Sequence, residues 1–165
     1  MDRVVAAMAL AILLLSVAGA KEAAAGQPPV ITVGGGGWNQ TIDSSNLTAG
    51  AGSDLTPTYS SAGTTLDINA TPNPSPWTIR VSRDSAAWNS NLQLSVKLTG
   101  VGSGQKSSVT TPVGSTTLVT TAATTFISGK GYTTGMAWNY ILGNVSVSIP
   151  PGTYTTTVTF TATSP

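Results

Sequence analysis

The sequence predicts an all-β protein, a single antiparallel β-sandwich of Ig-like or jelly-roll type that follows a signal peptide. Apolar and polar residues alternate with period two in several short segments, and turn-forming residues recur about every 8–12 residues. After the apolar start, no segment has 3.6-residue periodicity over a helical length. About nine or ten short strands at this spacing are typical of a sandwich or jelly roll. No repeat of fixed period indicates a solenoid or propeller.

Residues 1–25 have the features of a secretory signal peptide. A charged start precedes an apolar run at residues 4–17, which is shorter than the roughly 20 residues of a membrane helix. Small residues follow, and cleavage is expected after Ala20 or after Ala25. A retained anchor helix is the alternative. The expected location is therefore extracellular or at the cell surface, without membrane contact once the signal is cleaved.

The composition argues against catalysis and against nucleic acid as a partner. Only 8% of the residues are charged and the net charge is +1, whereas binding to nucleic acid or to an anionic membrane needs clustered Lys and Arg. The chain has no His and no Cys, so the usual general base, thiol nucleophile and preferred transition-metal ligands are absent. We therefore expect a protein that is not an enzyme, has no cofactor and is stable without disulfides.

The segment before the main domain is a candidate for strand exchange. We divide the mature chain into an extended strand with a glycine hinge at residues 26–37 and a sandwich domain at residues 38–165. The strand either pairs as an ordinary edge strand of its own domain or inserts into a neighbouring subunit, as donor strands do. The candidate donor strand consists of Val30, Ile31, Thr32 and Val33.

Alternation and turn residues place the strands of the main domain. Proline-rich residues 72–76 are expected to form a crossover, because proline fits neither a helix interior nor a central strand. The inward positions include Leu66, Ile68, Ala70, Trp77, Ile79, Val81, Leu92, Leu94, Val96 and Leu98. The expected strands cover residues 38–42, 55–59, 65–70, 77–83, 92–99, 116–121 and 124–128.

The C-terminal region predicts a long antiparallel hairpin. Its two arms are residues 141–149 and 154–163, joined by Pro150, Pro151 and Gly152, which suit a tight turn. In the second arm the apolar side chains fall on one face and the threonines on the other, which predicts a half-buried strand with a hydroxyl-covered outer face.

Two segments carry a resemblance to known families. Trp77-Thr78-Ile79 and Phe160-Thr161-Ala162, in a threonine-rich C-terminus, resemble the paired motifs of WxL-type bacterial surface domains, although the second lacks both Trp and Leu. The final hairpin is also similar to that of secreted pilin subunits of the spore-coat-U type, which contain cysteines that this chain lacks. The resemblance covers roughly residues 64–165. It implies noncovalent attachment to a cell surface or incorporation into a fibre.

Aromatic residues are the candidates for a ligand site. Tyr59, Trp88 and Trp138 lie in predicted loop or edge positions or at the start of the last hairpin, where rings can stack on sugars; large rings in a sandwich are also common core residues. Asp67 and Asn69 share a strand face, which fits either a calcium site or a solvated surface.

These observations predict a secreted, non-enzymatic structural or cell-surface-associated protein. It is expected to be a fibre or pilus subunit that assembles by donor-strand exchange, and its partners are copies of itself in a homopolymer or cell-wall polysaccharide. The alternative is a carbohydrate-binding module that uses exposed aromatic residues.

Overall fold

The chain folds into two antiparallel sheets, which confirms the all-β class. The structure is a computed structural model that describes residues 27–35, 37–71, 74–84 and 87–164, so the predicted signal peptide at residues 1–25 lies outside the described residues. The first sheet has the order β1 (Gln27–Val33), β3 (Thr64–Thr71), β9 (Thr133–Gly143), β5 (Gln93–Gly100) and β7 (Thr116–Leu118), with β2 (Tyr59–Ser60) also paired to β9. The second has the order β10 (Val158–Thr163), β4 (Pro76–Arg83), β8 (Thr124–Lys130) and β6 (Ser108–Val109).

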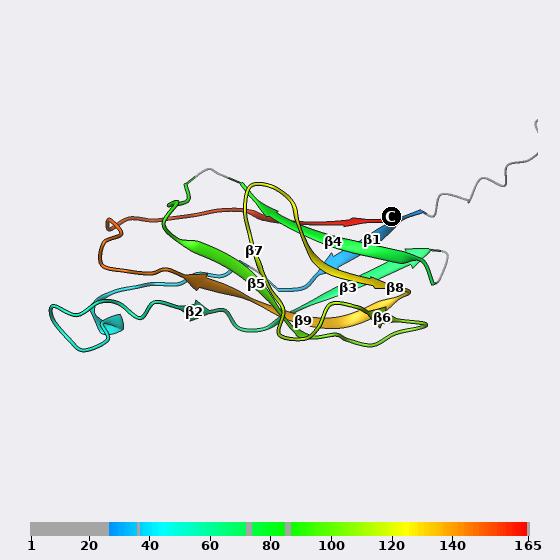
Figure 1. The fold of residues 1–165 in the computed structure, drawn as a ribbon, viewed down its shortest axis with the longest axis horizontal. Coiled ribbons are helices and arrows are strands. Elements are labelled where there is room, and N and C mark those ends of the chain that lie inside the picture. The colour runs from blue at the N-terminus through cyan, green and yellow to red at the C-terminus, as the bar shows by residue number, and fades with distance from the viewer. Residues whose placement is uncertain (1–26, 36, 72–73, 85–86, 165) are drawn as a thin grey trace, which may run out of the picture.

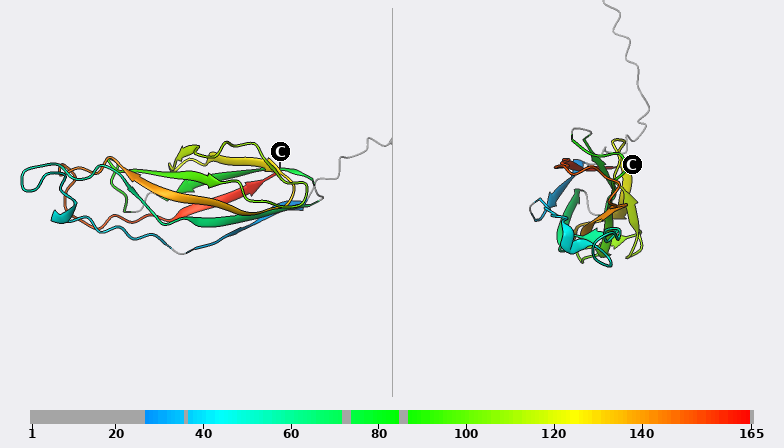
Figure 2. Two further views of the ribbon diagram at one scale, coloured as in Figure 1. Left: turned by 90° about the horizontal axis from the view of Figure 1, so that it is seen from below. Right: turned by 90° about the vertical axis from the view of Figure 1, so that its left-hand side faces the viewer.

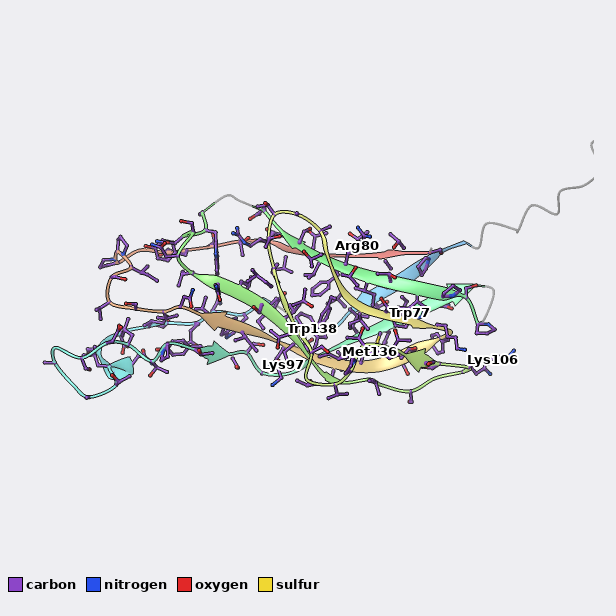
Figure 3. The ribbon with its side chains drawn as sticks, in the orientation of Figure 1. Trp77, Arg80, Lys97, Lys106, Met136 and Trp138 are labelled. Atoms are coloured by element: carbon purple, nitrogen blue, oxygen red, sulfur yellow. The ribbon has the colours of Figure 1, made fainter. Side chains whose placement is uncertain are left out.

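The inner faces of the two sheets share one hydrophobic core. Successive side chains of a strand point to opposite faces, so each strand contributes every second residue to it. Figure 3 shows Trp77 of β4 and Met136 and Trp138 of β9 lying between the two layers. The strongest contributors, all almost completely buried, are Leu66, Ile68, Trp77, Ile79, Val81, Val96, Leu98, Phe126, Ile127, Met136 and Trp138.

The molecule is elongated along its strands (Figures 1 and 2). β1 begins and β10 ends at the same end of the long axis, where Figure 1 marks the C-terminus. The loop that contains the short 3-10 turn η1 (Ser44–Asn46) and the loop that follows β9 lie at the opposite end. The two ends are therefore different in character: one is made of strand ends, the other of long loops.

The strongly alternating segments are found where they were predicted. Leu66, Ile68 and Ala70 of β3 are buried, and β4 and β5 bury the expected inward residues. β3 and β4 belong to different sheets, so the proline-rich stretch between them links the two sheets, although residues 72–73 are not among those described. The short strand β6 was not predicted, because two residues are too few to show alternation.

Residues 38–42 do not form the expected strand. Trp38 is half-buried and stacks on Tyr140 with a ring separation of 6.2 Å and an interplanar angle of 5°, so a ring contact fixes this segment in place of a ladder. The expected strand at residues 55–59 is reduced to an isolated bridge between Leu55 and Leu47 and to the two residues of β2.

The predicted C-terminal hairpin is wrong. β9 ends at Gly143 and lies in the first sheet, whereas β10 lies in the second and pairs with β4. Asn144 has a φ of 59°, a left-handed conformation that interrupts an extended strand. Residues 144–157 therefore cross from one sheet to the other. The predicted alternation of the last strand is confirmed, because Val158, Phe160 and Ala162 are half-buried and the threonines between them are exposed.

The loop after β5 packs closely against the start of β9. Ser103 and Thr134 exchange backbone hydrogen bonds of 3.0 and 2.7 Å. A Cβ at Gly102 would overlap the carbonyl oxygen of Thr134, and a Cβ at Gly104 would overlap that of Tyr132. The glycines predicted to form a loop thus allow two backbones to approach each other.

Candidate functional site

β1 is an edge strand paired within its own sheet. It runs antiparallel to β3, with Val30 opposite Asn69 and Val33 opposite Leu66. In β1, Pro29 is buried and Ile31 is half-buried, while the Val30 side chain is 66% exposed and that of Val33 is 39% exposed. β3, by contrast, buries Leu66, Ile68 and Ala70. Side-chain packing therefore holds β1 much less firmly than its neighbour.

The glycine stretch after β1 continues the pairing with β3 before it leaves the sheet. The Gly34 amide donates to the Thr65 carbonyl oxygen at 2.8 Å, and the Thr64 hydroxyl donates to the Gly34 carbonyl oxygen. A Cβ at Gly34 would lie 2.8 Å from the Thr65 hydroxyl oxygen, so a larger residue there would require the Thr65 side chain to turn. Gly35 has a φ of 84°, which glycine adopts without strain. The predicted hinge is thus anchored at its first residue.

β1 and β10 lie beside each other along one side of the molecule. Each is the edge strand of its own sheet, and the two strands are in contact. Ile31 of β1 and Phe160 and Ala162 of β10 all pack against the core that the sheets share. β1 therefore helps to close the gap between the two sheets on this side.

Trp138 is a core residue and its ring is not available to a surface ligand. Its side chain is 1% exposed, and its ring lies 4.8 Å from those of Tyr140 and Phe160. The sequence could not decide this, because β9 begins at Thr133, eight residues before the arm predicted at residues 141–149, and Trp138 lies on its inward face.

Trp88 and Tyr59 are half-buried, and both pack against a small second cluster formed by Leu92, Leu142 and Val145. The Trp88 indole donates to the Leu92 carbonyl oxygen at 3.0 Å, and the Arg83 guanidinium lies 5.5 Å from the centre of its ring. One face of the Trp88 ring is thus covered. The Tyr59 hydroxyl is buried and has no hydrogen-bond partner among the described residues.

The aromatic residue that sequence reasoning missed is Tyr132. Its side chain is 39% exposed, whereas the other described aromatic residues are buried or half-buried. It follows Gly131 in the tight connection between β8 and β9, so it belongs to no alternating pattern. Its position directly after a turn glycine was the available signal.

Tyr132 lines a shallow pocket on the outer face of β1 and β3. The pocket has a volume of about 250 Å³ and is lined by Val30, Thr32, Asp67, Ile68, Asn69 and Tyr132. The Asp67 carboxylate accepts a hydrogen bond of 2.7 Å from the Gly135 amide, so it holds the start of β9. Within the described ranges no three His, Cys, Asp or Glu residues cluster as metal ligands would.

A second polar cluster joins the loops at the far end of the molecule. The Asp54 carboxylate accepts hydrogen bonds from the amides of Val147 at 2.9 Å and Leu55 at 2.8 Å, and from the Ser146 hydroxyl at 3.3 Å. These bonds, that from Val147 above all, lower the pKa of Asp54 below its ordinary value of 3.8. The ionised carboxylate thus links two loops that are far apart in the sequence.

This link is expected to loosen in acid. Because the folded-state pKa of Asp54 is lowered, its contribution is present above pH 3.8 and is lost as the pH falls below that value. In an NMR titration from about pH 6 to about pH 2, the amide signals of Val147 and Leu55 should shift with a midpoint below 3.8. Asp54→Asn should abolish the shift. A midpoint at or above 3.8 would contradict the assignment.

No family model, curated protein or solved structure matches this chain. No helix long and apolar enough to cross a membrane occurs in the described part of the chain.

Proposed function

We propose that this chain is an exported, non-catalytic structural or cell-surface-associated protein. Its fold is a β-sandwich of Ig-like or jelly-roll type, and it assembles into a fibre by exchange of β1 between copies. The absence of His and Cys, the low charge and the hydroxyl-covered outer face of β10 support a structural role. The resemblance to WxL-type and pilin domains supports a location at a cell surface, with copies of itself or wall polysaccharide as partners.

The observation that carries the proposal is the weak attachment of a complete edge strand. Among the described residues, the backbone of β1 pairs with β3 alone, and the residues of β1 that are not exposed are Pro29, which is buried, and Ile31, which is half-buried against the core. When β1 of another copy occupies the same position, every one of these contacts is restored. The free energy of the exchanged arrangement therefore differs little from that of the single copy. The extent of exchange depends on the protein concentration and on the connection through residues 34–37.

The direction of exchange determines the kind of assembly. If each copy donates β1 to the next and receives β1 from the previous one, the contact is heterologous and a chain of copies grows. Reciprocal exchange between two copies closes a dimer instead. The proposed fibre subunit requires the first arrangement.

A disulfide across β1 and β3 is the decisive experiment. Val30 and Asn69 face each other in the register, and opposed residues of antiparallel strands lie close enough for a disulfide. The exported protein carrying Val30→Cys and Asn69→Cys has no other cysteine. We expect a ladder of covalently linked copies on a non-reducing denaturing gel after oxidation. Disulfides confined to single chains would overturn the exchange.

The matched control is Val30→Cys combined with Thr99→Cys. Thr99 is exposed on β5, and two strands separate β5 from β1 in the sheet, about 14 Å at the usual spacing. A disulfide within or between paired strands is therefore not expected for this variant. A ladder of equal intensity from the control would show that the cross-links come from random collision.

A further inference from the structure

We infer that the pocket at Tyr132 is a binding site for one neutral sugar unit of a polysaccharide. The pocket lies where β1, β3 and the start of β9 meet on the outer face of the first sheet. Its walls combine the exposed ring of Tyr132, the exposed aliphatic side chain of Val30 and three hydrogen-bonding side chains from the strands. Ile68 also lines the pocket, but it is 1% exposed and belongs to the core, so its side chain does not serve as a wall. A pyranose has the same combination, an apolar C–H face and a rim of hydroxyls.

The polar groups of the pocket are free to bind a ligand. Among the described residues, no hydrogen bond engages the side chains of Thr32, Asn69 or Tyr132, and one carboxylate oxygen of Asp67 is bonded to Gly135 while the other is not. The Asn69 amide and the two hydroxyls supply donors, and the Asp67 carboxylate and the Asn69 carbonyl supply acceptors. Such a set can bond vicinal hydroxyl groups, each of which both donates and accepts.

The charge of the lining argues against anionic ligands. Among the residues that the structure describes, no Lys or Arg side chain lines the pocket and Asp67 is its one charged group, so phosphate, sulfate and acidic sugars would meet repulsion without compensation. The volume of about 250 Å³ is below the usual range of about 300–1,000 Å³ for drug-sized ligands. The pocket suits a single ring of a longer chain that continues into solvent at both ends.

The pocket exists when β1 is seated on β3. Val30 and Thr32 come from β1, whereas Asp67 and Asn69 come from β3. A bound sugar therefore adds contacts that stabilise the seated strand. The same walls form whether β1 belongs to the same copy or to a neighbour, so the sugar site does not depend on the proposed exchange and the two ideas fail separately.

Titration of the exported protein with four neutral oligosaccharides tests this site. Cellohexaose, chitohexaose, xylohexaose and laminarihexaose are followed by calorimetry and by NMR shifts of the Asn69 and Tyr132 amides. For one sugar ring in a shallow pocket we expect a Kd of about 1 mM for at least one of the four. No binding to any of them would overturn the inference.

Variants then locate the binding. We expect Tyr132→Ala to weaken it by about tenfold or more and Asn69→Ala by about fivefold, because one removes the ring and the other a hydrogen-bonding group. Asn91→Ala is the matched control, since Asn91 is also exposed but lies outside the pocket, and its affinity should be unchanged. Affinity retained in both Tyr132→Ala and Asn69→Ala would overturn the site. Tyr132→Phe keeps the ring, so its loss of oligosaccharide affinity should be smaller than that of Tyr132→Ala.

Discussion

Replacing Trp77 with alanine is expected to lower the free energy of unfolding by about 3–5 kcal/mol, the usual cost of removing a buried tryptophan. Trp77 is 1% exposed, and it is the second residue of β4, with its side chain between the two sheets. Its indole donates to the Gly131 carbonyl oxygen at 2.9 Å, and its ring fills the space beside Gly129. Urea unfolding followed by circular dichroism measures the loss.

Trp138 provides a matched comparison for the hydrogen bond of Trp77. Both indoles are 1% exposed, but the Trp138 Nε1 has no partner among the described residues. Trp77→Phe leaves the buried Gly131 carbonyl without its donor, whereas Trp138→Phe removes a donor that makes no bond. We therefore expect Trp77→Phe to be the more destabilising variant by about 1–3 kcal/mol. Equal losses would show that the bond to Gly131 contributes nothing.

Gly102→Ala is expected to destabilise the fold by about 3 kcal/mol or more. Gly102 has a φ of 67°, which costs a residue with a Cβ about 1–2 kcal/mol, and the new methyl group would overlap the Thr134 carbonyl oxygen. The overlap is with backbone, so it cannot be relieved by turning a side chain. The paired hydrogen bonds between Ser103 and Thr134 would have to shift or break. Chemical denaturation measures the change.

Gly135→Ala separates the conformational cost from the overlap. Gly135 has the same φ of 67°, but nothing lies within 4 Å of the position that its Cβ would occupy. Its destabilisation should be limited to about 1–2 kcal/mol. Gly63→Ala, which has neither feature, should be nearly neutral. If Gly102→Ala and Gly135→Ala were equally destabilising, close packing of the loop against β9 would be wrong.

The sequence predicts the fold well where apolar and polar residues alternate strongly, because the alternation determines which face of a strand is buried. The inward residues of β3, β4 and β5 and the outward threonines of β10 are examples, because a strand with one buried face has one acceptable orientation. Alternation says nothing about which strand pairs with which. Residues 141–149 and 154–163 look like hairpin arms, yet the left-handed turn at Asn144 sends the chain to the other sheet.

The candidate site was harder to predict than the fold. The segment at residues 30–33 is a strand as expected. Its pairing with β3 depends on the tertiary structure and could not be predicted from the sequence of the segment. Trp138 lies on the inward face of a strand whose beginning the sequence did not indicate, so its burial was missed. Tyr132 lies in a turn, and its exposure depends on how β1 and β3 meet beside it.

The two ends of the described chain emerge together, and this gives the molecule a direction. The beginning of β1 and the end of β10 lie at one end of the long axis, and the loops that Asp54 joins lie at the other (Figure 1). A tether at either strand terminus would therefore make the domain a rigid spacer. It would hold the loop-bearing tip a full strand length away from whatever the tether is fixed to, and it would turn that tip outward.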